Sequence, residues 1–169
     1  MIPLARWRAI SPGFTSGTTS GTSGSRRHAT LSSMTTAPAF TAEEHRLRDE
    51  SRKILGAPAL GVCATCVRVP VFNGHAESIV AELERPMNAK AARELLRAAP
   101  GILLMDEAKD GGYPTPLDAE GTDATFVGRL RDDPTAPNSV AFWCVADNVR
   151  KGAAANAVQI AEILVRDYL

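Results

Sequence analysis

The sequence predicts an α+β fold in which a mixed, mostly antiparallel sheet carries helices packed on one face. Runs rich in Val and Thr alternate with segments that have helical spacing and helix caps. Two of these runs, 126–131 and 140–145, are joined across Asp133-Pro134, which favours an antiparallel hairpin. Because no G-x-G-x-x-G follows a strand, we expect a Rossmann domain to be absent from this chain.

Residues 1–40 differ in composition from the rest of the chain. They contain four arginines and no Asp or Glu, so the formal net charge of zero divides into about +4 here and −4 in the remainder. Ser, Thr and Gly fill the stretch that follows Phe14, as far as Ser25. We predict a disordered or non-native leader over 1–40 and a folded domain over 41–169. The leader is open to three interpretations: a transit peptide, a disordered extension, or sequence upstream of a true start at Met34.

The chain has neither the apolar run of a secretory signal nor the roughly 18 consecutive apolar residues of a membrane span. We therefore expect a cytoplasmic protein, or an organellar one if the leader is a transit peptide. The three cysteines lie in apolar strand-like runs, which favours free buried thiols. Cys63 and Cys66 should point to opposite faces of one strand, so we expect no metal site.

The first folded element is a helix from Thr41 to Leu55. Thr41-Ala42-Glu43-Glu44 forms a capping box, and Gly56 and Pro58 end the helix. Two strands are predicted next, over 60–72 and 77–84, on either side of an Asn73-Gly74 turn.

The second half of the chain continues the same alternation. Asn88 can cap a helix that runs through Ala99, and a short buried strand follows over 102–105. Residues 110–121 are rich in Gly and Pro and are predicted as a loop. After the 126–145 hairpin, a last helix from Lys151 to Tyr168 should present an apolar side.

Arg68 and His75 lie on either side of the predicted turn. A guanidinium offers a bidentate fork for a carboxylate, and an imidazole is the side chain whose unperturbed pKa lies nearest neutrality. The pair suits a site that binds a carboxylate and moves a proton, although Arg and His beside a turn are more often plain surface residues.

Two further groups of residues could carry chemistry. Glu50 and Lys53 share a face of the first helix, either as a solvated ion pair or as groups that bind a substrate ammonium and an anion such as phosphate. Residues 147–153 join the last strand to the last helix. There Asp147 or Asn148 could cap the helix, and exposed amides could meet an anionic or amide-bearing ligand.

Four motifs follow one another along the chain: residues 50–55 (ESRKIL), 64–78 (ATCVRVPVFNGHAES), 126–129 (FVGR), and 147–154 with 156–162 (DNVRKGAA and NAVQIAE). Together they resemble the aspartate-semialdehyde dehydrogenase family, over about residues 40–169. Members of this family are longer, with a Rossmann domain and a nucleophilic cysteine before the matched region. The resemblance therefore identifies the chain as a C-terminal catalytic and dimerisation fragment.

The resemblance implies an NADP-dependent, phosphorylating oxidation of L-aspartate 4-semialdehyde to 4-phospho-L-aspartate, on the route to lysine, threonine, methionine and isoleucine. In the family a cysteine thiolate attacks the aldehyde, hydride leaves to NADP, and phosphate cleaves the thioester. Cys66 belongs to the strand motif and does not match that nucleophile. Because the main NADP-binding domain is also missing, we expect no activity from the isolated chain.

By motif, His75 is similar to the family's acid/base catalyst and Arg68 to the residue that binds the substrate carboxylate. Glu50 is similar to the residue that contacts the substrate amine, and Lys53 to the one that contacts phosphate. Asn148 falls in the stretch that approaches the nicotinamide of NADP. The resemblance also implies a homodimer, with no nucleic-acid or membrane partner.

Two alternatives stay open. The chain could be a catalytically inactive dimerisation module of the same family, perhaps paired with a full-length subunit. It could also be related to N-acetyl-γ-glutamyl-phosphate reductase, which shares the reaction type. The Cys66 to Ser78 run favours the aspartate enzyme.

Overall fold

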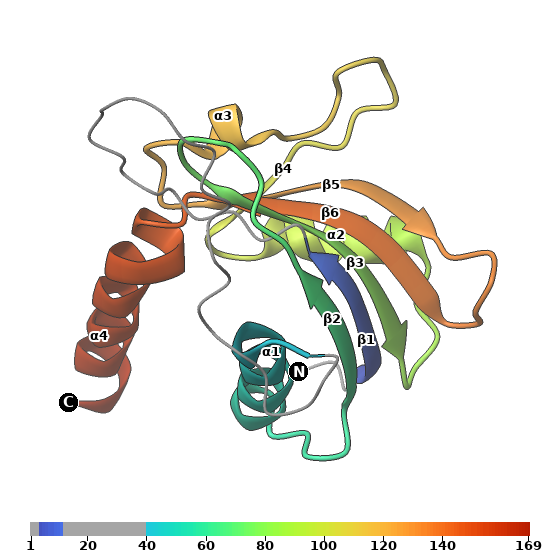
Figure 1. The fold of residues 1–169 in the computed structure, drawn as a ribbon, viewed down its shortest axis with the longest axis horizontal. Helices are drawn as coiled ribbons and strands as arrows, with labels where there is room; N and C mark the ends of the chain where they lie inside the picture. Colours follow the sequence, from blue (N-terminus) through green and yellow to red (C-terminus); the bar gives the residue numbers. More distant parts are fainter. Residues whose placement is uncertain (1–3, 12–39) are drawn as a thin grey trace, which may run out of the picture.

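A six-stranded sheet forms the centre of the fold, in the order β2-β1-β3-β6-β5-β4 (Figure 1). The computed structural model describes the backbone of residues 4–11 and all of residues 40–169. Two strand pairs, β1 with β2 and β4 with β5, are parallel, and the other three are antiparallel. The mixed, mostly antiparallel sheet predicted from the sequence is confirmed. Its strands are β1 (Leu4–Ser11), β2 (Gly61–Cys66), β3 (His75–Leu83), β4 (Ile102–Leu104), β5 (Thr125–Asp132) and β6 (Ser139–Ala146).

Strand β1 is an element that the sequence did not predict. Leu4–Ser11 pairs with both β2 and β3, so it lies inside the sheet and not at an edge. The rest of the predicted leader, residues 1–3 and 12–39, lies outside the described residues. The division of the chain into 1–40 and 41–169 therefore stays a prediction.

Helices α1 (Ala42–Ile54) and α2 (Ala89–Ala98) begin where the sequence predicted. The Thr41 side chain accepts from the Glu44 N–H and the Glu44 carboxylate accepts from the Thr41 N–H, which completes the capping box. Asn88 caps α2 by accepting from the Ala91 N–H at 2.9 Å. Both caps are local interactions, which is why short sequence patterns were enough to find them.

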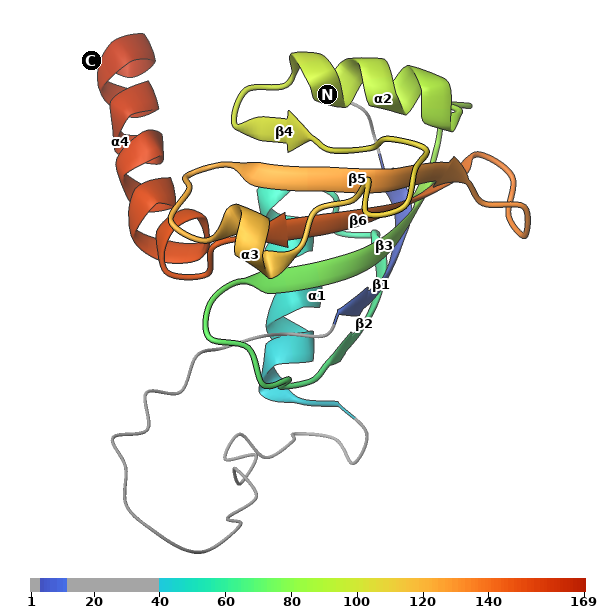
Figure 2. The same ribbon diagram turned by 90° about the horizontal axis from the view of Figure 1, so that it is seen from above.

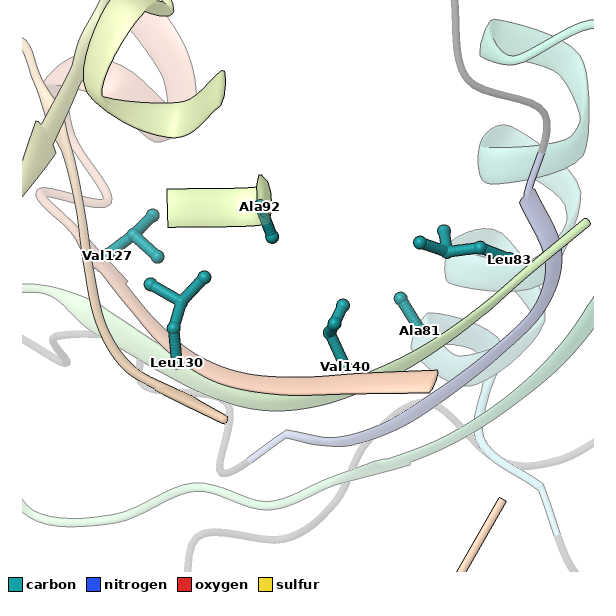
Figure 3. Close-up of a cluster of buried hydrophobic side chains, with 6 residues drawn as sticks. All are labelled: Ala81, Leu83, Ala92, Val127, Leu130 and Val140. Atoms are coloured by element: carbon teal, nitrogen blue, oxygen red, sulfur yellow. The ribbon is translucent and has the colours of Figure 1, made fainter. Parts of the chain in front are cut away.

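The main hydrophobic core lies between α2 and the sheet. Six buried side chains meet there (Figure 3): Ala81, Leu83, Ala92, Val127, Leu130 and Val140. Since side chains alternate along a strand, the odd-numbered residues of β3, beginning with His75, share the face that α2 covers. Ile79 of β3 and Ala64 of β2 both pair with the same residue of β1, so the buried Ala64 lies on this same face. Helix α1 packs against β2 there. Both helices therefore cover one face of the sheet.

A short helix on the opposite face corrects one prediction. Residues 110–121 were expected to form a loop, yet Pro116–Ala119 forms α3. Pro116 stands at the first helical position and the Asp118 carboxylate accepts from the Thr115 N–H at 2.7 Å, two signals that the surrounding Gly and Pro residues obscured. Ala119 is fully buried against Val145 in a second apolar cluster.

The last helix starts as a π-helical turn, η1 (Arg150–Ala154), and continues as α4 (Ala155–Tyr168). Figure 2 shows α4 projecting from the end of the sheet, away from α1 and α2. No residue of α4 is buried, so its apolar side is left uncovered by the described part of the chain. Among the described residues, no helix has the length and apolarity needed to cross a bilayer.

Candidate functional site

His75 is the first residue of β3 and follows a turn that requires glycine. Gly74 has φ of 91° and is buried, and a Cβ there would lie 3.1 Å from the Pro116 Cβ and 3.4 Å from the Ala146 carbonyl oxygen. The turn brings the chain onto the sheet with the half-buried imidazole on the face that α1 and α2 cover.

Asn148 lies beside this turn, although it is far away in the sequence. The antiparallel register pairs His75 with Ala146, so Asn148 comes next to Gly74, and its Oδ1 accepts from the Gly74 N–H at 2.8 Å. A backbone N–H can only donate, which fixes the orientation of the Asn148 amide. The Nδ2 group then remains as a donor for a carbonyl or other acceptor.

Gly152 completes the contact between the two motifs. A Cβ at this position would lie 3.0 Å from His75 Cε1 and 3.7 Å from His75 Nδ1. The absence of a side chain therefore lets η1 approach the edge of the imidazole. The run around His75 and the segment 147–153, which the sequence singled out separately, form one site.

Asp147 holds the turn between β6 and η1. The residue is 4% exposed. Its Oδ1 accepts from the N–H groups of Val149 and Arg150 at 2.8 and 2.9 Å, and Oδ2 accepts from the Gly121 N–H at 2.9 Å. Burial by itself would raise the pKa of this carboxyl, but the three hydrogen bonds outweigh it and the pKa lies below its usual range. The sequence had offered Asp147 only as a possible helix cap.

Arg68 lies beyond the end of β2, because the strand predicted over 60–72 stops at Cys66. Its Nη2 donates to Glu43 Oε2 at 2.9 Å, and the two side chains are 46% and 44% exposed. An ion pair this exposed contributes at most about 1 kcal/mol. A carboxylate ligand can therefore compete with Glu43 for the guanidinium at little cost.

Glu44 fixes the position of α1 relative to this arginine. Its Oε1 accepts from the Cys66 N–H at 2.8 Å, while Oε2 serves the capping box. Burial by itself would raise the pKa of this carboxyl. The hydrogen bonds from the Thr41 and Cys66 N–H groups have the larger combined effect, so the pKa lies below its usual value. The sequence identified the capping role of Glu44 but not its bond to β2.

Glu50 and Lys53 are exposed on α1, and within the described residues no ion pair joins them. Glu50 is seven residues after Glu43, which puts it on the same side of the helix about 10 Å farther along the axis. The structure thus places Glu50 on the face that carries the partner of Arg68. None of the described contacts joins Glu50 or Lys53 to His75.

The site predicted from the sequence therefore has two parts. In one part, Gly152 lies against the His75 ring and Asn148 binds the backbone of Gly74; the other part is Arg68 with α1. The connection from β2 to β3 links them, running in Figure 1 from beside α1 to the end of the sheet next to η1 and α4. Both parts belong to the same face of the sheet.

Neither Cys66 nor Cys144 is prepared to act as a nucleophile. Burial, with added repulsion from Glu43 and Glu44, raises the pKa of Cys66 to about 11. Burial, with added repulsion from Glu77, raises the pKa of Cys144 to about 12. Both thiols stay protonated near neutral pH, whereas reactive thiols have lowered pKa values.

Arg129, the charged residue of the motif 126–129, lies on the other face of the sheet. Arg129 has φ of 57° at a β-bulge in β5, and it lines a hollow with Ser78 and Trp143. Ser78 alternates with His75 across β3, so the hollow faces away from the imidazole. The structure does not bring this motif to the His75 site.

Comparison with known proteins gives consistent results. Residues 32–151 match the family described as semialdehyde dehydrogenase, dimerisation domain. Aspartate-semialdehyde dehydrogenase from Aquifex aeolicus is 49% identical over 130 residues, and that from Streptomyces akiyoshiensis is 53% identical over 127 residues. These matches cover 77% and 75% of this chain but only 38% and 36% of the relatives, so the chain spans less than half the length of either.

A solved structure resembles the whole fold. The crystal structure of aspartate semialdehyde dehydrogenase II from Vibrio cholerae, complexed with ASA, superposes with a TM-score of 0.85 at 34% identity. The superposition covers 99% of this chain and 56% of that one.

Proposed function

The chain belongs to the semialdehyde dehydrogenase family, through its dimerisation domain, and from this premise we propose that it carries the substrate-binding and proton-transfer half of an aspartate-semialdehyde dehydrogenase. The proposed reaction is the phosphorylating oxidation of L-aspartate 4-semialdehyde by NADP. The observation that carries the proposal is the hydrogen bond from the Gly74 N–H, directly before His75, to Asn148 Oδ1 at the end of the β3–β6 pairing.

His75 is the proposed general acid/base. Attack of a thiolate on an aldehyde gives a tetrahedral alkoxide, which a protonated imidazole can stabilise by donating a hydrogen bond. The same imidazole can later exchange a proton with the incoming phosphate. The turn at Gly74 fixes the backbone before His75 and Gly152 lies against the edge of the ring, which favours the single ring position that proton transfer requires.

Arg68 is the proposed group for the α-carboxylate of the substrate. Its pairing with Glu43 keeps the guanidinium beside α1 when no substrate is bound. Glu50 would then meet the substrate ammonium and Lys53 the phosphate, since both are exposed on α1. A zwitterionic substrate and an anion would thus find charges of opposite sign along one helix.

The described residues suit only one end of NADP. Among the described residues no hydrogen bond uses the Nδ2 group of Asn148, and this donor fits the carbonyl oxygen of a carboxamide. The sequence has no G-x-G-x-x-G turn for a pyrophosphate. When bound, NADP accepts the hydride that leaves the substrate, and most of its contacts must come from residues other than those described.

The attacking thiolate is proposed to be neither Cys66 nor Cys144. The raised pKa values of these two thiols make them poor nucleophiles near neutral pH. Cys63, the third cysteine, is exposed within β2, and the sequence has no G-x-G-x-x-G turn for NADP. We therefore expect the isolated chain to give no phosphate-dependent NADP reduction.

A chimera tests the proposed function. Residues 41–169 would replace the matching segment of the Aquifex aeolicus enzyme, and NADP reduction would be measured with aspartate semialdehyde and phosphate. We expect turnover from the chimera, and a decrease in kcat of about 10²- to 10⁴-fold from His75→Asn in it. A folded chimera that binds substrate but shows no turnover, or a His75→Asn variant as fast as its parent, would contradict the proposal.

A second candidate function is assembly without catalysis, which the description of the matched family as a dimerisation domain favours. We propose a homodimer, which light scattering coupled to gel filtration would detect as twice the 18.0 kDa chain mass. A dimer that forms while the chimera stays inactive would support this candidate over the enzyme.

A further inference from the structure

We propose that Asp147 is a positioning residue for His75. Its buried carboxylate holds the β6–η1 turn, so that Asn148 keeps its hydrogen bond with the Gly74 N–H and Gly152 stays against the imidazole. The inference rests on the proposed role of His75. It adds a residue that touches neither substrate nor cofactor but acts through its neighbours.

The first step is the saturation of the carboxylate. Three backbone N–H groups point at it, from Gly121, Val149 and Arg150, and each distance is below 3 Å. A buried group with this many charge-assisted hydrogen bonds has a single favourable orientation. Removal of the carboxylate would leave all three N–H donors without this acceptor. One of them, the Gly121 N–H, belongs to the segment after α3 and not to the turn itself.

The second step connects Asp147 to the imidazole by two short routes. Through the next residue, Asn148, it reaches the Gly74 N–H, which directly precedes His75. Through its own carbonyl oxygen, which accepts from the Gly152 N–H at 3.0 Å, it fixes the glycine that lies against the ring. One residue is therefore connected both to the residue before His75 and to the glycine beside its ring.

A neighbouring ion pair offers a matched control. Arg150 donates from Nε and Nη2 to the two oxygens of Asp123, at 2.7 and 3.0 Å, and so also holds η1. This pair is exposed, and among the described residues no hydrogen bond joins either of its side chains to Gly74 or His75. Asp123→Asn should weaken this exposed side-chain pair but leave the backbone hydrogen bonds to Asp147 in place, so the imidazole should not move.

The test uses the full chain labelled with ¹⁵N and compares Asp147→Ala, Asp147→Asn and Asp123→Asn with the wild type. Two signals are read: the hydrogen exchange rate of the Gly74 amide, and the imidazole ¹⁵N shifts of His75, assigned with His75→Asn. We expect Asp147→Ala to accelerate Gly74 exchange about tenfold or more and to move the imidazole signals. Asp147→Asn, which keeps one acceptor oxygen, should fall between Ala and wild type, and Asp123→Asn should match wild type.

The proposal is wrong if the Asp147 variants lower only the melting temperature while both signals stay at their wild-type values. It is equally wrong if Asp123→Asn moves the signals as far as the Asp147 variants do. Should Asp147→Ala not fold, the comparison of Asp147→Asn with Asp123→Asn decides. In the chimera, Asp147→Asn should lower kcat and leave KM nearly unchanged. Because the two NMR signals need no turnover, an inactive chimera would contradict the proposed function and not this inference.

Discussion

Glu44 joins the first turn of α1 to the last residue of β2, since its Oε1 accepts a hydrogen bond from the Cys66 N–H at 2.8 Å. The same carboxylate completes the helix cap through its other oxygen. A single buried side chain thus sets the distance between the helix that carries Glu50 and Lys53 and the strand that leads to Arg68. The two halves of the proposed substrate site depend on it.

Glu44→Gln should therefore destabilise the chain. The amide keeps one acceptor oxygen but turns a donor toward the Thr41 or the Cys66 N–H, and a buried donor left without a partner costs about 1 to 3 kcal/mol. The free energy of unfolding in urea measures the loss. Glu43→Gln is the matched control, because the exposed pair of Glu43 with Arg68 contributes at most about 1 kcal/mol. Equal losses in the two variants would contradict the role given to Glu44.

The stability of the chain should decrease in acid. Glu44 and Asp147 are buried, which opposes ionisation, but their backbone hydrogen bonds prevail and lower both pKa values from the ordinary 4.5 and 3.8. Their contributions are complete above these ordinary values, which apply to the unfolded chain, and are lost as the pH falls through the lower folded values.

Urea midpoints measured as a function of pH check this expectation. We expect a decrease below about pH 4.5, and a shallower decrease in the double variant Glu44→Gln, Asp147→Asn. Asp49→Asn is the control, since its exposed carboxylate is screened by solvent. A double variant with the same acid dependence as wild type would assign the effect to other carboxylates.

Gly152→Ala should disturb the His75 ring without unfolding the chain. The new methyl group would lie 3.0 Å from His75 Cε1, closer than nearly all methyl contacts, so the ring or η1 must move by a few tenths of an ångström. The imidazole signals of His75 should shift, and the chimera should lose kcat. Ala153→Ser, an exposed change one residue away, should alter neither. Unchanged imidazole signals in Gly152→Ala would show that η1 does not lie against the ring.

Local interactions explain how much of the fold the sequence could predict. The caps at Thr41 and Asn88 and the β5–β6 hairpin depend on residues close together in the chain, and all three are confirmed. Strand β1 depends on pairing with β2 and β3, dozens of residues away, and nothing in its own composition indicated these partners. Its acid-free, arginine-containing surroundings favoured a leader instead.

The candidate site divides in the same way. His75 and Asn148 could be singled out by residue type and by resemblance, but the hydrogen bond of Asn148 with Gly74, the residue before His75, depends on the β3–β6 register, which no local pattern fixes. The roles of Asp147 and Glu44 as links between segments follow from the same long-range geometry. The sequence could predict the residues proposed to bind a ligand more readily than the residues that position those side chains.

Arg68→Lys should weaken substrate binding more than it affects folding. The lysine keeps the charge but loses the planar fork that pairs with both oxygens of a carboxylate, so in the chimera KM for aspartate semialdehyde should rise about tenfold or more, while kcat changes less. The melting temperature should stay nearly constant, because the pair with Glu43 is exposed. Arg48→Lys is the matched control, since Arg48 also pairs with an exposed carboxylate, that of Asp49, and is assigned no ligand. If both variants left KM unchanged, Arg68 would not bind the substrate carboxylate. If both raised KM equally, the cause would be the general charge around α1 and not a specific binding site at Arg68.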